Sequence, residues 1–195
     1  LFDEAYEFFN SPEPVSAMRY VQDIDATDLF VVGAATKGLQ SPGMRTGWVV
    51  ASKKHIELFR NYSSLGMGGV SRPSQLYVTQ LFEKQRVAQA RTAIASFYGK
   101  QRQRYGEGLR RLGFELFTGD GGFYHWAKLP AGLTGDAFNE RLFAHDAAIL
   151  PGRLCDMARR GDSGPMGPMV RFSFGPLGPE SCENDLAILA RCVGK

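Results

Sequence analysis

The first fifty residues alternate short apolar runs with loops. Residues 29–32 carry only hydrophobic side chains, a pattern typical of a buried strand in a parallel sheet, and Gly33 ends the run. A loop with two more glycines and a proline follows, and residues 49–51 form a second apolar run. The pattern predicts a buried strand followed by a glycine-bearing loop, with the tail of an earlier strand at residues 1–3.

A helical period begins after these runs. Ser52 is typical of a helix N-cap, and the apolar residues that follow it predict a helix of one or two turns. Residues 61–71 are rich in glycine, so we predict a loop there. From Pro73 to about residue 111 the pattern is helical for most of its length, although Gly99 and Gly106 are expected to kink or end it. Basic residues that alternate with glutamines late in this stretch are expected on a solvated face.

The second half of the chain mixes strands and helices. We predict strands at 113–117, 123–129, 147–150 and 170–174, and helices at 135–145 and 179–193. Alternation along the second strand sets His125 on one face and Tyr124 with Trp126 on the other. In the last strand three hydrophobic residues face a core, whereas Arg171 faces the other side. The apolar side of the first helix carries Phe138, Leu142 and Phe143. The apolar side of the second carries Leu186, Ile188, Leu189 and Val193.

Composition and charge narrow the class of protein. The 195 residues are 44% hydrophobic and 22% charged, which is typical of an ordinary globular protein with one large domain or two small ones. A net charge of +3 gives no footprint for nucleic acid, and no apolar run approaches the roughly 18 residues that cross a membrane. The three cysteines form no CxxC pair, so neither a disulfide framework nor a zinc site is predicted. We expect a cytoplasmic protein without a metal, a nucleic-acid partner or a membrane segment.

Two basic residues on the first glycine-bearing loop carry the candidate chemistry. Lys37 follows the first predicted strand, and Arg45 precedes the second apolar run. A lysine amine forms a Schiff base with an aldehyde, and an arginine guanidinium offers a fixed fork to phosphate oxygens. The pair therefore suits a ligand that carries both an aldehyde and a phosphate. The alternative is two exposed basic residues in a turn.

A third basic residue lies on the last predicted strand. Arg171 is a single arginine on the polar face of an otherwise apolar strand, and such a charge needs an anionic partner. That partner is either an external anion or a carboxylate of the chain itself. The remaining alternative is an arginine exposed to solvent.

These residues also carry a resemblance to a known family. Lys37, with the stretch Pro-Gly-x-Arg-x-Gly-Trp at 42–48, resembles the cofactor-lysine loop of the fold-type-I pyridoxal-phosphate enzymes, the class I and II aminotransferases. Asp3 and Tyr6 resemble the Asp-x-x-Tyr segment of the same family, and Arg171 lies in a match to its Arg-x-Ser strand. Because these elements follow one another in the family's order, the resemblance covers essentially the whole chain.

The resemblance implies a role for each of these residues. Lys37 is implied to hold pyridoxal 5′-phosphate as a Schiff base and to act as the catalytic base and acid. Asp3 is implied to pair with the pyridine nitrogen, Tyr6 with the phenolic oxygen and Arg45 with the phosphate. A carboxylate beside the nitrogen keeps the ring protonated, and a protonated ring is an electron sink. Arg171 is implied to clamp the α-carboxylate of an amino-acid substrate.

The chain departs from the family pattern at one position. The family has a serine or threonine three residues before the lysine, where this chain has Ala34, although Thr36 keeps a hydroxyl beside Lys37. We therefore expect phosphate affinity to be weaker, or to rest more on backbone amides, and we count Thr36 among the cofactor contacts. Residues 156–169 are rich in Gly, Pro and Arg and are expected to form a mobile loop close to the substrate.

The predicted fold is α/β, the C-terminal part of the aspartate aminotransferase-like fold of pyridoxal-phosphate transferases. Residues 1–104 are expected to form the remnant of a large cofactor-binding domain with most of a linking helix, and residues 105–195 a small α+β domain. The resemblance implies that the first half of the family fold is absent, with its glycine-rich phosphate turn and its ring-stacking aromatic. Ser71 is expected near the interface of a homodimer.

The predicted function is transfer of an amino group between an amino acid and a 2-oxo acid, by a pyridoxal-phosphate-dependent enzyme. The absent half of the fold is expected to be needed for this activity. One alternative is a lyase or a synthase that uses the same cofactor and fold. A second is a non-catalytic aminotransferase-like domain of a transcription regulator, and a third is a generic α/β domain with no cofactor.

Overall fold

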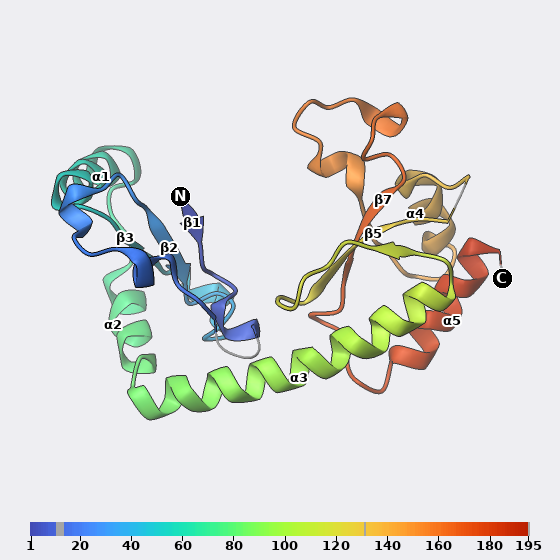
Figure 1. The fold of residues 1–195 in the computed structure, drawn as a ribbon, viewed down its shortest axis with the longest axis horizontal. Helices are drawn as coiled ribbons and strands as arrows, with labels where there is room; N and C mark the ends of the chain where they lie inside the picture. Colours follow the sequence, from blue (N-terminus) through green and yellow to red (C-terminus); the bar gives the residue numbers. More distant parts are fainter. Residues whose placement is uncertain (11–13, 131, 195) are drawn as a thin grey trace. The chain divides into compact units, whose positions relative to one another are not determined.

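The computed structural model describes residues 1–10, 14–130 and 132–194. The chain divides into two compact units, Leu1–Ser96 and Phe97–Lys195. Helix α3 (Lys84–Arg111) begins in the first unit and ends in the second (Figure 1). The domain boundary predicted at residue 105 lies further along this same helix.

A three-stranded sheet of order β1-β2-β3 forms the centre of the first unit. Strand β1 (Phe2–Asp3) pairs in parallel with β2 (Val31–Ala34), and β3 (Gly47–Val50) runs antiparallel to β2. The strand predicted at residues 29–32 corresponds to β2, which starts later than expected and continues through Gly33. A side chain has no room at this glycine, since a Cβ would lie 2.5 Å from the indole of Trp48, its partner across the ladder. Short 3-10 helices occupy Glu7–Phe9, Ala17–Tyr20, Ile24–Ala26 and Pro42–Met44 in this unit.

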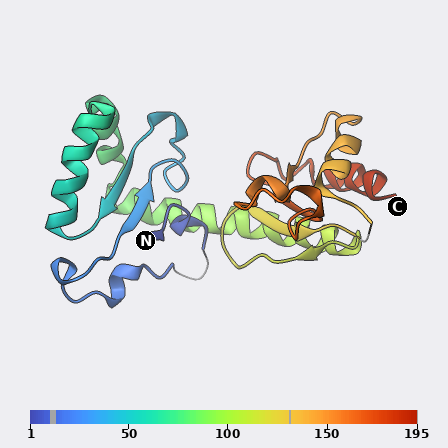
Figure 2. The ribbon, with the colours of Figure 1, turned by 90° about the horizontal axis from the view of Figure 1, so that it is seen from above.

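Helix α1 (Lys53–Met67) is longer than the sequence predicts. Ser52 is its N-cap residue, as expected, but Ser52 Oγ lies 2.7 Å from His55 Nδ1 and caps no backbone N–H group. The loop predicted at 61–71 is wrong over its first part, because the helix continues until Gly68, whose φ of 69° is left-handed. Figure 2 shows the helix beside the strands of the sheet.

The long helix predicted after residue 73 is two helices, α2 (Arg72–Leu81) and α3. Glu83 separates them, because its carboxylate oxygens accept hydrogen bonds of 2.9 and 2.8 Å from two N–H groups in the first turn of α3. Gly99 and Gly106 lie inside α3, so the expectation that they end a helix is wrong. Packing explains the second of them, since a Cβ on Gly106 would lie 3.3 Å from the ring of His125.

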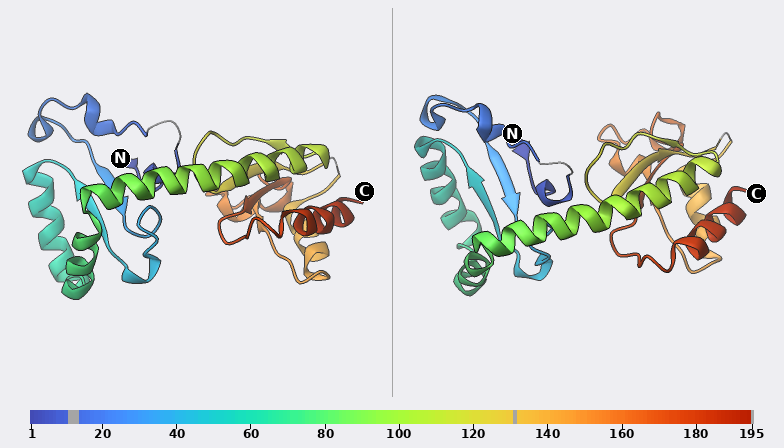
Figure 3. Two further views of the ribbon diagram at one scale, coloured as in Figure 1. Left: turned by 90° about the horizontal axis from the view of Figure 1, so that it is seen from below. Right: turned by 60° about the horizontal axis from the view of Figure 1, so that its bottom comes forward.

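The second unit contains a four-stranded antiparallel sheet of order β4-β5-β7-β6. Its strands are β4 (Glu115–Leu116), β5 (Tyr124–Lys128), β6 (Leu150–Pro151) and β7 (Met169–Ser173). Besides the end of α3, the unit contains the helices α4 (Gly135–Phe143) and α5 (Cys182–Val193). Short 3-10 helices occupy Gly152–Cys155 and Gly161–Ser163. Figure 3 shows α5 lying along the C-terminal part of α3. The two helices touch where a Cβ on Gly108 would lie 2.4 Å from the side chain of Leu186. Every strand and helix predicted in this half is present; most are shorter than predicted, β6 extends one residue past the predicted end, and β7 begins and ends one residue earlier than predicted.

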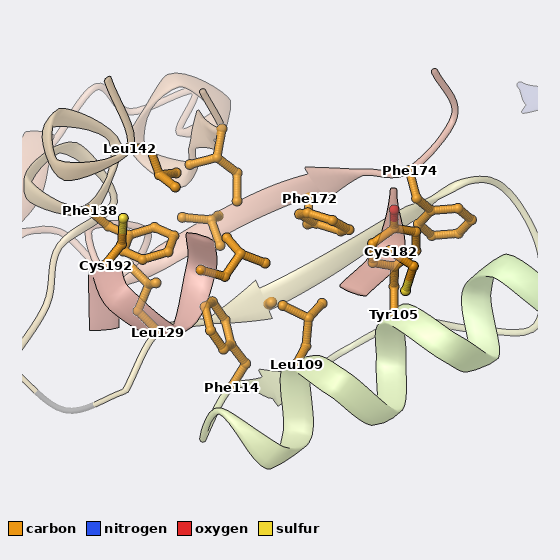
Figure 4. Packing of buried hydrophobic residues seen from close by; sticks show 14 residues of the cluster. Tyr105, Leu109, Phe114, Leu129, Phe138, Leu142, Phe172, Phe174, Cys182 and Cys192 are labelled. Atoms are coloured by element: carbon orange, nitrogen blue, oxygen red, sulfur yellow. The ribbon is translucent and has the colours of Figure 1, made fainter. Parts of the chain in front are cut away.

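One hydrophobic core fills the second unit (Figure 4). It consists of Tyr105, Leu109, Phe114, Ala127, Leu129, Phe138, Leu142, Ile149, Val170, Phe172, Phe174, Cys182, Leu189 and Cys192. The predicted alternation is confirmed, because His125 and Ala127 of β5 are 2% and 0% exposed and Val170 and Phe172 of β7 are 0% and 7% exposed. Phe143, predicted on the apolar side of its helix, is 59% exposed, whereas the neighbouring Leu142 is 2% exposed, so the prediction is wrong for Phe143.

Three general properties follow from the described residues. None of their helices combines the length and hydropathy that crossing a membrane requires. Across the same residues, no three His, Cys, Asp or Glu side chains gather in an arrangement that could hold a metal. The three cysteines are free thiols; Cys155 is exposed, and burial raises the pKa of Cys182 and Cys192.

Candidate active site

Strand directions in the first unit gather the candidate residues at one edge of its sheet. Because β1 and β2 are parallel, their carboxyl ends meet at the same edge, and antiparallel β3 starts there. Asp3 is the last residue of β1, and the loop between β2 and β3 carries both Lys37 and Arg45. The topology thus places the Asp3 carboxylate at the same edge as the loop that carries the Lys37 amine and the Arg45 guanidinium, although Asp3 is far from that loop in sequence.

Backbone hydrogen bonds and one glycine fix the loop that carries Lys37. The N–H of Ala35 donates to the carbonyl of Thr46 at 3.1 Å, and the N–H of Gln40 donates to the carbonyl of Lys37 at 3.0 Å. A Cβ on Gly38 would lie 2.6 Å from Cγ of the Phe8 ring. Only glycine therefore allows the loop to pack against the segment that follows β1.

That packing brings Lys37 to Tyr6. The Lys37 Nζ lies 5.7 Å from the centroid of the Tyr6 ring, within the range of a cation–π contact. Both residues are half-buried. An amine and a phenol are therefore neighbours at the carboxyl edge of the sheet.

An ion pair holds the segment that carries Tyr6. Arg91 Nη2 of α3 lies 2.9 Å from Glu7 Oε2, and the Arg91 guanidinium carbon lies 5.1 Å from the Phe8 ring centroid. Burial raises the pKa of Glu7, and the neighbouring Arg91 opposes that rise. The segment after β1 is thus fastened on both sides, by Gly38 of the lysine loop and by α3.

Asp3 is the last residue of β1, and Thr36 lies in the loop just after β2. Asp3 is exposed, and its Oδ1 accepts a hydrogen bond of 3.0 Å from the N–H of Ala5. Among the described residues this is the single hydrogen bond to its carboxylate, so Oδ2 is open to a cationic or protonated ligand group. Thr36 is half-buried beside Lys37.

Arg45 adopts a backbone conformation that is rare for its residue type. Its φ of 49° is left-handed, as is that of Gln40 in the same loop. Such conformations cost on the order of 1–3 kcal/mol and cluster at functional sites. The Arg45 Nη1 donates to the carbonyl of Pro42 at 3.0 Å, and the side chain is otherwise exposed. The remaining N–H groups of its guanidinium are available to an anion.

This donor set fits pyridoxal 5′-phosphate. Each polar group of that cofactor has a matching side chain here: an amine for the aldehyde, a carboxylate for the ring nitrogen, a phenol for the phenolic oxygen, and a guanidinium for the phosphate. Two hollows border the edge, one of about 690 Å³ that Asp3 and Tyr6 line and one of about 510 Å³ that Arg45 and Trp48 line. Lys37 lines neither of these two hollows.

Arg171 belongs to the second unit and lies on the open face of its sheet. It is exposed, and its guanidinium carbon lies 4.6 Å from the centroid of the Tyr124 ring. No carboxylate within residues 1–10, 14–130 and 132–194 forms an ion pair with it, which argues against the internal ion pair as an alternative. Tyr124 is a contact that we did not predict, although the alternation of β5 and β7 puts both residues on one face.

Internal hydrogen bonds order the loop predicted to be mobile at residues 156–169. The Asp156 carboxylate is buried and accepts from the N–H of Ala158 at 3.1 Å and from Nε of Arg160 at 2.9 Å. The guanidinium of Arg160 holds the pKa of Asp156 well below its usual range. Next to it, Arg153 pairs with both Asp136 and Asp162.

Three further residues make contacts that are structural. His125 is a core residue; burial lowers its pKa to about 4, and its Nδ1 and Nε2 lie 3.1 Å from Thr118 Oγ1 and the carbonyl of Arg102. Arg102 was expected on a solvated face but is half-buried and donates to the carbonyls of Asp120 and Gly122. The hydroxyl of Ser71 accepts from the N–H of Ser74 at 3.4 Å and so caps α2.

Comparison with known proteins points to one family. Residues 1–179 match the family "Aminotransferase class I and II". An LL-diaminopimelate aminotransferase of Dehalococcoides mccartyi is 29% identical over 119 residues, which are 60% of this chain and 30% of that protein. An L-aspartate:5-guanidino-3-methyl-2-oxopentanoate transaminase of Pseudomonas syringae is 24% identical over 124 residues, 60% of this chain and 32% of that protein.

Solved structures share the fold. An aspartate aminotransferase mutant of Thermus thermophilus aligns with a TM-score of 0.81 and 23% identity, over 97% of this chain and 47% of that one. An α-aminoadipate aminotransferase of the same organism, complexed with N-(5′-phosphopyridoxyl)-L-leucine, aligns with a TM-score of 0.82 and 20% identity, over 98% and 49%. The predicted aspartate aminotransferase-like fold is confirmed. The chain spans about half the length of these structures and about a third of the curated relatives.

Proposed function

This chain belongs to the class I and II aminotransferase family, and we propose that it is part of an enzyme that moves an amino group between an amino acid and a 2-oxo acid. Pyridoxal 5′-phosphate is the cofactor that membership of this family indicates. One observation carries the proposal most directly. Asp3, Tyr6, Lys37 and Arg45 lie at the same edge of one sheet, with Lys37 Nζ 5.7 Å from the Tyr6 ring.

Each residue of this edge is assigned to a different group of the cofactor. Lys37 supplies the amine that binds the aldehyde, and Arg45 supplies a planar fork for the phosphate. Asp3 supplies the anion that a protonated ring nitrogen requires. Tyr6 and Thr36 supply hydroxyls for the phenolic oxygen and the phosphate. When bound, the cofactor provides an electron sink for the electron pair of the substrate's Cα–H bond.

Lys37 is also the residue that moves the proton. Its amine would accept the proton that leaves the substrate's α-carbon, as a general base, and would then donate that proton, as a general acid, to the carbon of the cofactor that carries the aldehyde. The backbone of the loop supports this role. Gln40 and Arg45 have left-handed backbone conformations, and such strained conformations persist only where the surrounding structure fixes them. A fixed loop keeps the amine at the reaction centre between the two transfers.

Arg171 is assigned the substrate α-carboxylate. A guanidinium binds a carboxylate through two parallel hydrogen bonds, and in the described residues no acidic side chain competes for it. Arg171 belongs to the small domain that we assign to residues 105–195, and the residues assigned to the cofactor belong to the domain of residues 1–104. Both an amino acid and a 2-oxo acid carry the carboxylate that this residue binds.

We also assign the protein to a homodimer in the cytoplasm. Helix α1 supports an interface, because Leu58, Tyr62 and Leu65 lie on one helical face and are 61%, 75% and 90% exposed. Ser71 follows this helix closely. Light scattering on the purified protein measures the mass, and a monomer at micromolar concentration would contradict the assignment.

Labelling of the cofactor lysine tests the proposal. The longest native polypeptide that contains this chain is incubated with pyridoxal 5′-phosphate, reduced with borohydride and mapped by mass spectrometry. We expect the pyridoxyl group on Lys37, no label in Lys37→Ala, and an unchanged label in Lys54→Ala, which removes an exposed lysine. Amino-group transfer to 2-oxoglutarate is measured in parallel. A label spread over several lysines, or label without transfer, would refute the proposed function.

A further inference from the structure

We propose that Tyr124 is a positioning residue, whose ring holds the guanidinium of Arg171 in place for the substrate carboxylate. The inference rests on the proposed function of Arg171 and adds to it the group that orients this side chain. Neither the loop pattern nor the Arg-x-Ser strand points to Tyr124. The contact between the two side chains carries the inference.

The strand register sets these residues side by side. Tyr124 of β5 is opposite Ser173 of β7, and Trp126 is opposite Arg171. Tyr124 and Arg171 are therefore diagonal neighbours on the face of the sheet that is turned away from the core. The guanidinium carbon lies 4.6 Å from the Tyr124 ring centroid, where the negative face of the ring attracts a cation.

A row of aromatic rings fixes Tyr124 from behind. The Phe123 ring lies 4.6 Å from that of Tyr124, and the Tyr98 ring of α3 lies 5.6 Å from that of Phe123. Gly175, just after β7, is pressed against Phe123, since a Cβ there would lie 2.5 Å from the ring. The Tyr98 hydroxyl donates to the carbonyl of Gly175 at 3.2 Å. The row thus joins α3, β5 and the end of β7.

An aromatic partner suits a guanidinium that must bind a ligand. A carboxylate beside Arg171 would fix it equally well, but it would occupy the N–H groups that a substrate carboxylate needs. A ring face attracts the positive charge and leaves every N–H group in the plane of the guanidinium available. Holding the flexible arginine before the substrate arrives reduces the entropy lost on binding. We therefore expect Tyr124 to act on affinity and not on the chemical step.

Substitution of Tyr124 in the pyridoxal-phosphate-loaded full-length protein tests the inference. Two probes are used. The KM is measured with the best substrate found in a screen of the standard amino acids. The Kd is measured by calorimetric titration with hexanoate, a carboxylate without an amino group. We expect Tyr124→Leu to raise both KM and the Kd of hexanoate about two- to fivefold, with kcat little changed. Tyr124→Phe, which keeps the ring, restores most of the affinity. Phe143→Leu, an exposed aromatic of the same unit, is the matched control and leaves both constants unchanged.

The variant Arg171→Leu separates the inference from the proposed function. If Arg171→Leu weakens hexanoate binding and Tyr124→Leu does not, the positioning role is refuted and the carboxylate role stands. If Arg171→Leu binds hexanoate as well as the wild type, both fail. An equal loss in Tyr124→Phe and Tyr124→Leu would also overturn the inference, because it would attribute the effect to the hydroxyl. A fall in kcat with an unchanged KM would have the same consequence.

Discussion

Single residues at the first sheet edge show how close contacts, and not hydrogen-bonding side chains alone, define the candidate site. Gly38 follows Lys37 directly, and the Phe8 ring occupies the space where its side chain would be. Phe8 is 4% exposed and has the Arg91 guanidinium 5.1 Å from its ring, so it has little freedom to move. The position of Lys37 relative to Tyr6 therefore depends on a residue that carries no chemistry.

The substitution Gly38→Ala should separate the lysine loop from the segment after β1. Its Cβ would lie 2.6 Å from the Phe8 ring, and overpacking of this kind costs about 1–3 kcal/mol of the free energy of unfolding. The control is Gly43→Ala in the same loop, where a Cβ meets nothing within 4 Å. We expect a lower urea midpoint for Gly38→Ala and no loss for Gly43→Ala. Equal midpoints for the two variants would contradict the contact.

At the scale of elements, period and alternation predict the second unit well and the first unit less well. The faces of β5 and β7 follow from strict alternation, because one side of each strand is buried in the core. The end of α1 did not follow, since glycine signals both a loop and a helix C-cap, and Gly66 lies inside the helix before Gly68 ends it. The contact between Tyr124 and Arg171 depends on strand register, which periodicity alone does not give.

In the candidate site, the identities of some residues can be predicted from the sequence, whereas their proximity depends on the fold. The identities of Lys37 and Arg45 follow from a local motif, because both lie on one short loop. The proximity of Tyr6 to Lys37 depends on a parallel pairing of β1 with β2 across a long connection, which no local pattern specifies. The resemblance implied that proximity, and the topology explains it physically.

Two glycines of α3 give the test that belongs to this scale. A Cβ on Gly108 would lie 2.4 Å from Leu186 of α5, whereas a Cβ on Gly99 meets nothing within 4 Å. We expect Gly108→Ala to lower the free energy of unfolding by about 1–3 kcal/mol, because two packed helices must separate. Gly99→Ala should raise it by about 0.5–1 kcal/mol, because alanine favours the helix. Chemical denaturation followed by circular dichroism measures both, and a stabilising Gly108→Ala would contradict the helix contact.

At the scale of the whole molecule, the two units differ in how much apolar surface they bury. All the residues of the main hydrophobic core belong to the second unit, whereas α1 in the first unit has no buried residue. Local opening is easiest where few apolar contacts must break. The chain is therefore expected to have two levels of stability, with the candidate cofactor residues in the less stable unit.

Hydrogen exchange on this chain measures that difference. We expect the amides of β5 and β7 to exchange slowest, because both strands are paired within the sheet and face the core. Among the helices, the amides of α1 should exchange fastest. We expect their exchange rates to exceed those of β5 and β7 by at least about two orders of magnitude, since a gap of about 3 kcal/mol in opening free energy corresponds to that factor. Equal protection in α1 and β7 would mean that the first unit is stabilised by contacts on its exposed apolar face. Repeating the measurement at several protein concentrations identifies the source, because protection by a second copy rises with concentration and protection within one chain does not.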